Sequence, residues 1–134
     1  MRRVLRVFCL AVLIAMVAGF AASAQKAAQI DICGTWAGSA VINGGAANED
    51  FTMIIEKKEA AYTGKITTAT GLAQDAELRN IVLEGDKLSL EFDLNGDPNG
   101  DVISVDVTVT ADAMTGTWSS LSGQGDTIEA KRQK

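Results

Sequence analysis

The sequence of 134 residues carries 12 basic and 17 acidic side chains, no histidine and a formal net charge of −5, and its length suits a single domain. This acidic balance repels the phosphate backbone, so we predict no nucleic-acid partner. Histidine is the commonest general base and the serines have no evident base partner, so we predict that the chain is not an enzyme and binds no cofactor.

The first 24 residues predict a secretory signal peptide. Three arginines at positions 2, 3 and 6 precede the apolar run Val7–Phe20, and the small residues Ala22, Ser23 and Ala24 follow it. This order is typical of a signal peptide that is cleaved after Ala24. The apolar run is shorter than the roughly 20 residues that span a bilayer, so we predict a mature form that does not span the membrane. We therefore expect a periplasmic or secreted protein.

Removal of residues 1–24 would leave 110 residues, a net charge of −8 and Cys33 as the only cysteine. One cysteine cannot form an internal disulfide, so an apolar core has to stabilise the fold. Without histidine or a second cysteine, Cys33 lacks the partners of a thiol catalyst or a zinc site. We expect a small structural residue at the entrance of a strand; pairing between chains and a free reactive thiol are the alternatives. Residues 25–33 are predicted to be a flexible lead-in.

Apolar and polar residues alternate from residue 34 onward, with turn residues between the alternating segments. This pattern is typical of antiparallel strands with one face in water, and no segment has a helical period. In chain order, the predicted strands are 35–43, 50–58, 61–69, 76–85, 87–94, 101–111, 114–120 and 126–134. The phase of the alternation is ambiguous in 76–85. Eight short strands joined by short links can close into a barrel, which leaves no exposed sheet edge. We therefore predict an all-β fold over residues 34–134: an eight-stranded antiparallel up-and-down (meander) barrel.

The predicted loop at 95–100 lies within a run of oxygen-bearing side chains at every second position: Asp93, Asn95, Asp97, Asn99 and Asp101. This spacing is typical of calcium loops. However, Pro98 replaces the turn glycine, and no glutamate follows at the twelfth place. Asn-Gly and Asp-Pro-Asn-Gly are also ordinary turn sequences. We therefore predict a solvated hairpin loop and no metal site, with a calcium site as the alternative.

The inward positions of the predicted barrel are almost wholly apolar. A barrel of eight strands is either filled by its own side chains or holds one small ligand. Small residues at inward positions 38, 40, 64 and 116 favour some free space near the tryptophan-bearing strands. The predicted ligand-binding residues are Phe51, Met53, Tyr62, Phe92, Met114 and Trp118. We predict an exported binding protein that holds a small apolar ligand in the barrel. The alternative is a packed barrel that acts through its loops as a protein-interaction or inhibitor module, with an unknown protein partner.

Both tryptophans follow Gly-Thr, in "GTW" at 34–36 and again at 116–118. Gly-x-Trp on the first strand of an eight-stranded meander resembles the calycin superfamily, which includes lipocalins, fatty-acid-binding proteins and avidins. The resemblance implies that Trp36 packs across one end of the barrel under a basic residue of the last strand, and strand phase favours Arg132 over Lys131 for that residue. A guanidinium stacked on an indole keeps its charge in water, so such a pair can close a barrel.

Some segments resemble avidins in particular: "YTGKITTATG" at 62–71, "GTWSS", and "GDTIEAKR" at 125–132. This resemblance implies a ligand-facing Trp118 and a polar contact from Asp126; the alternative is that Trp118 is a core residue. The first strand lacks the polar positions that follow the tryptophan in avidins, and Ile66 occupies the place of a ligand-contacting tyrosine. We therefore do not predict biotin binding.

Overall fold

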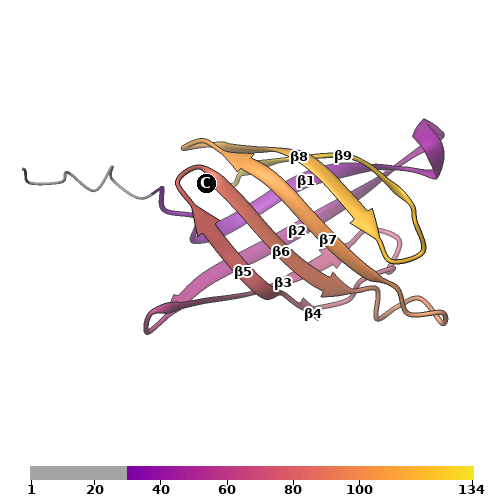
Figure 1. Cartoon of the computed structure of the whole chain (residues 1–134), viewed down its shortest axis with the longest axis horizontal. Helices are drawn as coiled ribbons and strands as arrows, with labels where there is room; N and C mark the ends of the chain where they lie inside the picture. Colours follow the sequence, from indigo (N-terminus) through magenta and orange to yellow (C-terminus); the bar gives the residue numbers. More distant parts are fainter. Residues whose placement is uncertain (1–29) are drawn as a thin grey trace, which may run out of the picture.

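The computed structural model describes residues 30–134, which form one antiparallel sheet curled into an almost closed barrel (Figure 1). The predicted signal peptide and residues 25–29 of the predicted lead-in lie outside the described residues. The strands are β1 (Gly34–Ile42), β2 (Ala47–Lys58), β3 (Ala61–Thr68), β4 (Ala76–Glu77), β5 (Arg79–Glu84), β6 (Lys87–Asp93), β7 (Val102–Val109), β8 (Ala113–Ser120) and β9 (Gly125–Arg132), and a 3-10 turn, η1 (Asn43–Gly45), follows β1. Within residues 30–134, no helix has the length and apolar character needed to cross a membrane.

The strands follow one another around the barrel in the order β4-β3-β2-β1-β9-β8-β7-β6-β5. Neighbours in this order are consecutive in the chain except at one place, where the first strand pairs with the last. There Trp36 lies opposite Arg132, and Ala40 lies opposite Ile128. The predicted all-β antiparallel meander is therefore confirmed.

The sheet has nine strands rather than the predicted eight, because the segment predicted as one strand at 76–85 is divided. Strand β4 pairs with β3, whereas β5 pairs with β6. Near the start of β5, Asn80 has a φ of 49°, in the left-handed region, and the β5–β6 register shifts between Arg79 and Val82. This irregularity lets the chain leave one edge of the sheet and join the other edge, and it accounts for the ambiguous phase of the alternation there.

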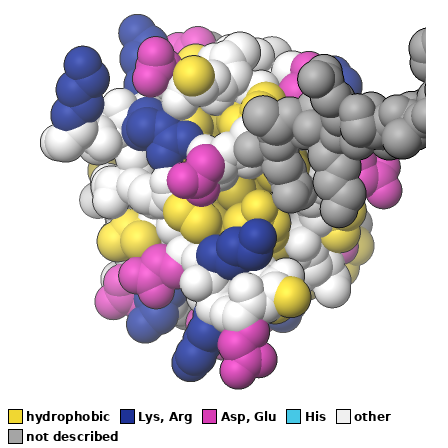
Figure 2. Space-filling model, turned by 90° about the vertical axis from the view of Figure 1, so that its left-hand side faces the viewer, with side chains coloured by type: hydrophobic (Ala, Val, Ile, Leu, Met, Phe, Trp, Pro, Cys, Tyr) yellow, Lys and Arg dark blue, Asp and Glu magenta, His cyan; other side chains and the backbone are white. Residues whose placement is uncertain are grey.

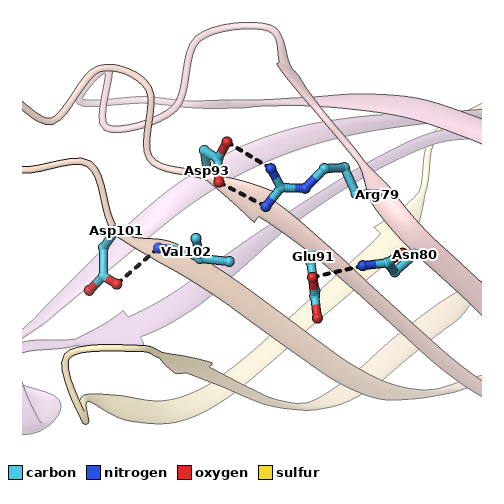
Figure 3. A network of polar contacts seen from close by, with 6 residues as sticks. All are labelled: Arg79, Asn80, Glu91, Asp93, Asp101 and Val102. Atoms are coloured by element: carbon cyan, nitrogen blue, oxygen red, sulfur yellow. Dashed lines mark hydrogen bonds and ion pairs between the residues drawn. The ribbon is translucent and has the colours of Figure 1, made fainter.

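Polar side chains fix the irregular start of β5 against β6 (Figure 3). The two terminal nitrogens of Arg79 donate to the two carboxylate oxygens of Asp93, at 2.9 and 2.8 Å. The Nδ2 of Asn80 donates to Oε2 of Glu91 at 3.0 Å. Exposed ion pairs of this kind contribute little to the free energy of folding. Their position indicates a role in register, since they determine which residues of β5 and β6 stand side by side.

The two ends of the barrel are built from different segments. One end, here called the closed end, is formed by the residues before β1, the end of β9, and the hairpins β2–β3, β5–β6 and β7–β8. The opposite end, here called the mouth, is formed by four loops: 43–46, 69–75, 94–101 and 121–124. In Figure 1 the closed end lies at the left and the mouth at the right.

Three inward glycines let neighbouring strands approach closely. A Cβ atom on Gly38 would lie 1.9 Å from the carbonyl oxygen of Glu129, and one on Gly116 would lie 2.1 Å from that of Asp106. A Cβ atom on Gly64 would likewise clash with the backbone of the adjacent strand. The prediction that these glycines leave free space inside the barrel is therefore wrong, because backbone occupies the space that a side chain would need.

Candidate functional site

At the closed end, the indole of Trp36 is fully buried and the guanidinium of Arg132 stacks on it. The distance from Cζ of Arg132 to the centroid of the indole ring is 4.4 Å. The indole Nε1 donates a hydrogen bond to the backbone carbonyl of Ile32 at 3.0 Å, so its polar atom is satisfied although it is buried. Together, the indole and the guanidinium cover this end of the barrel.

Arg132 also joins three chain segments. Its Nη1 and Nη2 donate to the backbone carbonyls of Cys33 and Asp31, and its Nε donates to the carbonyl of Ala111 at 3.0 Å. The residues before β1, the last strand and the β7–β8 hairpin are thereby connected through one side chain. Packing and hydrogen bonding both hold the closed end, so the mouth is the end with room for a site.

Cys33 lies directly before β1 and is half-buried. Burial raises the pKa of its thiol, and the nearby carboxylate of Asp31 raises it further. The Asp31 carboxylate itself accepts a hydrogen bond from the backbone N–H of Cys33 at 2.9 Å, which lowers the pKa of that carboxyl group. A thiol with a raised pKa is a weak nucleophile at neutral pH, so its surroundings favour the structural interpretation of Cys33.

The mouth contains a small cavity of about 70 Å³. Ten of its 12 lining residues are apolar, and they come from seven strands and two loops. Phe51, Phe92 and Trp118 are the aromatic walls, and the two polar lining residues are Glu49 and Thr68. Pockets for drug-sized ligands commonly measure about 300–1,000 Å³. This cavity therefore suits one end of a slender apolar molecule and not a bulky one.

Below the mouth cavity, the interior of the barrel is packed. The next void, which Met53 and Met114 border, has a volume of about 10 Å³. That volume is close to the least that holds one water molecule. Phe51, Ile66 and Ile128 border both spaces and separate them. A ligand at the mouth would therefore stop at these three side chains.

Three of the six predicted ligand-binding residues meet at the mouth cavity: Phe51, Phe92 and Trp118. Met53 and Met114 lie deeper, at the smaller void. Tyr62 lies near the β2–β3 hairpin at the closed end, where the ammonium nitrogen of Lys57 is 5.5 Å from the centroid of its ring. Tyr62 borders neither space. The structure thus divides the predicted set among three levels of the barrel.

Trp118 is held in one orientation at the wall of the cavity. Its side chain is only 9% exposed, and its Nε1 donates to the backbone carbonyl of Val41 at 2.8 Å. Asp126, which stands opposite Trp118 on β9, does not border the cavity, and its carboxylate accepts a hydrogen bond from the backbone N–H of Thr127 at 2.8 Å. The indole therefore presents an apolar face to the cavity without offering its N–H to a ligand.

Glu49, which was not among the predicted site residues, is 5% exposed and is the one buried charged or polar residue among residues 30–134. Its Oε1 accepts two hydrogen bonds from Thr70, one from the backbone N–H at 2.9 Å and one from the hydroxyl at 2.6 Å. Within the described part of the chain, no group donates a hydrogen bond to its Oε2, and no cation pairs with it. A signal was available, because β2 begins at Ala47 and the inward alternation of Phe51 continues backward to Glu49.

Side chains fix the loops around the mouth. Asn95 accepts a hydrogen bond from the backbone N–H of Gln74 and donates one to the carbonyl of the same residue, both at 2.7 Å, which joins the β6–β7 loop to the β3–β4 loop. Asp101 accepts a hydrogen bond from the hydroxyl of Ser122 at 2.5 Å, which joins the β6–β7 loop to the β8–β9 loop and lowers the pKa of the Asp101 carboxyl group. The mouth is therefore largely preformed, as small-molecule sites commonly are.

The alternating side chains between positions 93 and 101 turn to different partners. Asp93 pairs with Arg79, Asn95 binds the β3–β4 loop, and Asp97 accepts a hydrogen bond from the backbone N–H of Asn99 at 2.9 Å. Across the described residues, no group of three or more His, Cys, Asp or Glu side chains is arranged to hold a metal ion. The calcium alternative therefore gains no support from the arrangement of this loop.

No protein-family model matches the chain, and no curated protein or solved structure matches it either. The resemblance to calycins consequently remains a prediction that rests on the Gly-x-Trp motif, the number of predicted strands and a basic residue on the last strand, whereas the barrel architecture is observed directly.

Proposed function

We propose that the protein is an exported small β-barrel binding protein that holds a small apolar ligand at the mouth of its barrel. The observation that carries this proposal is the mouth cavity, which is about 70 Å³ in volume and has ten apolar lining residues. Burial of ligand surface against such walls is favourable by about 25 cal/mol per Å² of apolar area. The loops around the cavity are already tied together, so little ordering would oppose binding.

An exposed leucine lies in one of the mouth loops. Leu121 belongs to the β8–β9 loop and is 79% exposed, more than the other two exposed large apolar side chains among residues 30–134. A single exposed leucine is common on protein surfaces, and Leu121 does not border the cavity, so the cavity alone carries the proposal.

Export and a calycin-like character are part of the proposal. Residues 1–24 have the charged, apolar and small-residue order of a signal peptide. The stacking of Arg132 on Trp36 supports the resemblance to calycins, because the resemblance implies such a cation over the first tryptophan.

Filling the cavity tests the binding site directly. Ala40 on β1 borders the cavity, so we expect Ala40→Leu to occupy the space and to weaken the binding of 1-octanol by at least about tenfold. Ala37→Leu on the outer face of the same strand is the matched control and should leave binding unchanged. Isothermal titration calorimetry measures both affinities. If the wild-type protein and both variants bind 1-octanol with equal affinity, the mouth is not the site.

Native mass spectrometry of the protein purified from its own host tests export and cargo together. We expect a chain that lacks residues 1–24 and carries an additional small apolar mass. A chain that retains these residues would contradict export, and a mature chain without any bound mass would count against a resident ligand.

The packed interior favours one alternative function, a protein-interaction or inhibitor module that acts through the mouth loops. The void below the mouth cavity is only about 10 Å³, so the barrel could serve as a solid scaffold for loops such as that of Leu121. Affinity capture from periplasmic extract with the wild-type protein and with Leu121→Ser tests this function. A partner that only the wild-type protein retains would support it, and retention of the same proteins by both would contradict it.

A further inference from the structure

We propose that the ligand of the mouth cavity carries a positively charged amine head that pairs with Glu49, so that the site selects amphiphilic amines. This inference rests on the proposed function, because it names the chemical class of the ligand for the same site. Its starting point is a carboxylate inside an otherwise apolar opening.

Glu49 is only partly satisfied by the chain. Thr70 donates twice to Oε1, but no group among residues 30–134 donates to Oε2. The ion pair found in this part of the chain joins Arg79 to Asp93, so Glu49 has no cation beside it. Every fully buried side-chain polar atom of residues 30–134 has a hydrogen-bond partner, so Oε2, which has none, retains access to solvent. A bound ammonium would replace water at this oxygen and would supply both a donor and the opposite charge.

The position of Glu49 fits a ligand that enters with its tail first. Along β2, Glu49 lies two residues nearer the mouth than Phe51, and both side chains border the cavity. Phe51, Ile66 and Ile128 form the inner limit of the cavity. An alkyl tail would therefore lie against these three apolar side chains, while a head group at the level of Glu49 would stay close to water.

The charges around the two ends of the barrel favour a cation at the mouth. The four mouth loops contain Asp75, Asp97 and Asp101 and neither lysine nor arginine. Figure 2 views the closed end and shows Lys and Arg side chains there, among acidic ones; Lys57 and Lys87 belong to the hairpins at this end. An opening lined with one sign of charge raises the local concentration of ions of the opposite sign.

The same charges disfavour the other two head groups. A carboxylate head would meet Glu49 and the aspartates of the mouth loops, and two like charges inside one apolar site repel strongly. A neutral hydroxyl head could donate one hydrogen bond to Oε2 but would leave the charge of Glu49 uncompensated. An amine head is therefore expected to bind best, a hydroxyl head second and a carboxylate head least.

Three probes with the same eight-carbon tail separate these cases: octylamine, 1-octanol and octanoate, each titrated into the protein by calorimetry at pH 7 and below the concentrations at which they form micelles. We expect the wild-type protein to bind octylamine at least about tenfold more tightly than 1-octanol, the ratio that one charge-assisted hydrogen bond supplies. In Glu49→Gln this preference should disappear, because the amide keeps the shape of the side chain but removes its charge.

Asp50→Asn is the matched control, since Asp50 is the next residue on β2 and its side chain is exposed on the outer face. This variant removes one negative charge without changing the cavity, so the preference for octylamine should persist. Glu49→Met, with an apolar chain of similar length, is a second variant in case Glu49→Gln does not fold, and it should bind octylamine no more tightly than 1-octanol, because the ammonium would have no partner.

The outcomes distinguish the two proposals. Equal binding of octylamine and 1-octanol by the wild-type protein, or tightest binding of octanoate, overturns the assignment of an amine head and leaves the apolar site intact. A preference for octylamine that survives in Glu49→Gln overturns the role of Glu49. If none of the three probes binds, the proposed function itself fails.

Discussion

Arg132 combines stacking and hydrogen bonding in one side chain. Its guanidinium covers the indole of Trp36 and donates to the backbone carbonyls of Asp31, Cys33 and Ala111. Each of these carbonyls lies outside the ladder of the sheet, where water would otherwise have to satisfy it. A lysine could not make the same set of contacts, because its ammonium is a single point charge without a planar fork.

Replacement of Arg132 should therefore destabilise the fold more than replacement of its neighbour. We expect Arg132→Ala to lower the free energy of unfolding by about 2–3 kcal/mol, from the lost charged hydrogen bonds and the lost stacking. Lys131→Ala removes an exposed cation from the next position and should change it by less than about 0.5 kcal/mol. Urea unfolding followed by far-ultraviolet circular dichroism measures both, and equal midpoints for the two variants would contradict the role given to Arg132.

The thiol of Cys33 should titrate at a higher pH in the folded protein than in the unfolded chain. Burial raises its pKa above the ordinary value of 9.0, so the folded state holds this proton more tightly. The resulting stabilisation is complete below the pKa of the unfolded thiol and is lost as the pH rises through the folded value. Alkylation by iodoacetamide at a series of pH values measures the pKa of the thiol in the folded protein and in urea. The midpoint of each pH profile gives this pKa, since the midpoint does not depend on the maximal rate of alkylation. A folded midpoint at or below that of the protein in urea would contradict the expected shift.

At the scale of the element, close contact between strands depends on residues without a side chain. Gly116 on β8 stands opposite Val107 on β7, and an added Cβ atom would lie 2.1 Å from the carbonyl oxygen of Asp106. Strand β1 shows the same relation at Gly38, next to β9. These two contacts therefore lie at the β1–β9 pair and at the β7–β8 pair.

A methyl group at position 116 should therefore force the β7–β8 pair apart. We expect Gly116→Ala to destabilise the fold by about 1–3 kcal/mol, the usual cost of overpacking. Ser119→Ala, at an exposed position of the same strand, is the control and should have an effect within about 0.5 kcal/mol. Thermal and urea unfolding measure both variants; a Gly116→Ala protein as stable as the wild type would show that the strands can separate without cost.

At the scale of the whole molecule, the sequence predicted what depends on local periodicity. The side-chain period of a half-buried strand is two, so segments such as Lys87–Asp93 and Val102–Val109 could be recognised without knowledge of their neighbours. The division of 76–85 could not, because it depends on which strands lie on either side. Asn80 adopts a positive φ where the chain changes partner. The ambiguous alternation of 76–85 marked the irregular segment but could not show which strands its two parts would pair with.

Some of the residues that line the candidate site could be predicted from the sequence, but their positions along the barrel axis and the buried charge of Glu49 could not. Strand phase placed Phe51, Phe92 and Trp118 inward, but the distance of each from the mouth follows from the stagger of all the strands around the barrel. Glu49 was missed because the strand was expected to begin at residue 50, one residue after it, so no strand phase was assigned to its side chain. The volume of the cavity depends on how the side chains pack, which no single strand determines.

The described chain enters and leaves the barrel at the same end. Asp31 and Cys33 bind Arg132, and the backbone N–H of Gln133 donates to the carbonyl of Thr35, so both termini of the described residues meet beside Trp36, opposite the four mouth loops. A tether after Lys134, such as a C-terminal tag that immobilises the protein on a sensor chip, would therefore attach at the base and orient the opening toward the bulk solution. Captured this way, the copies on the chip would present their four mouth loops to the analyte.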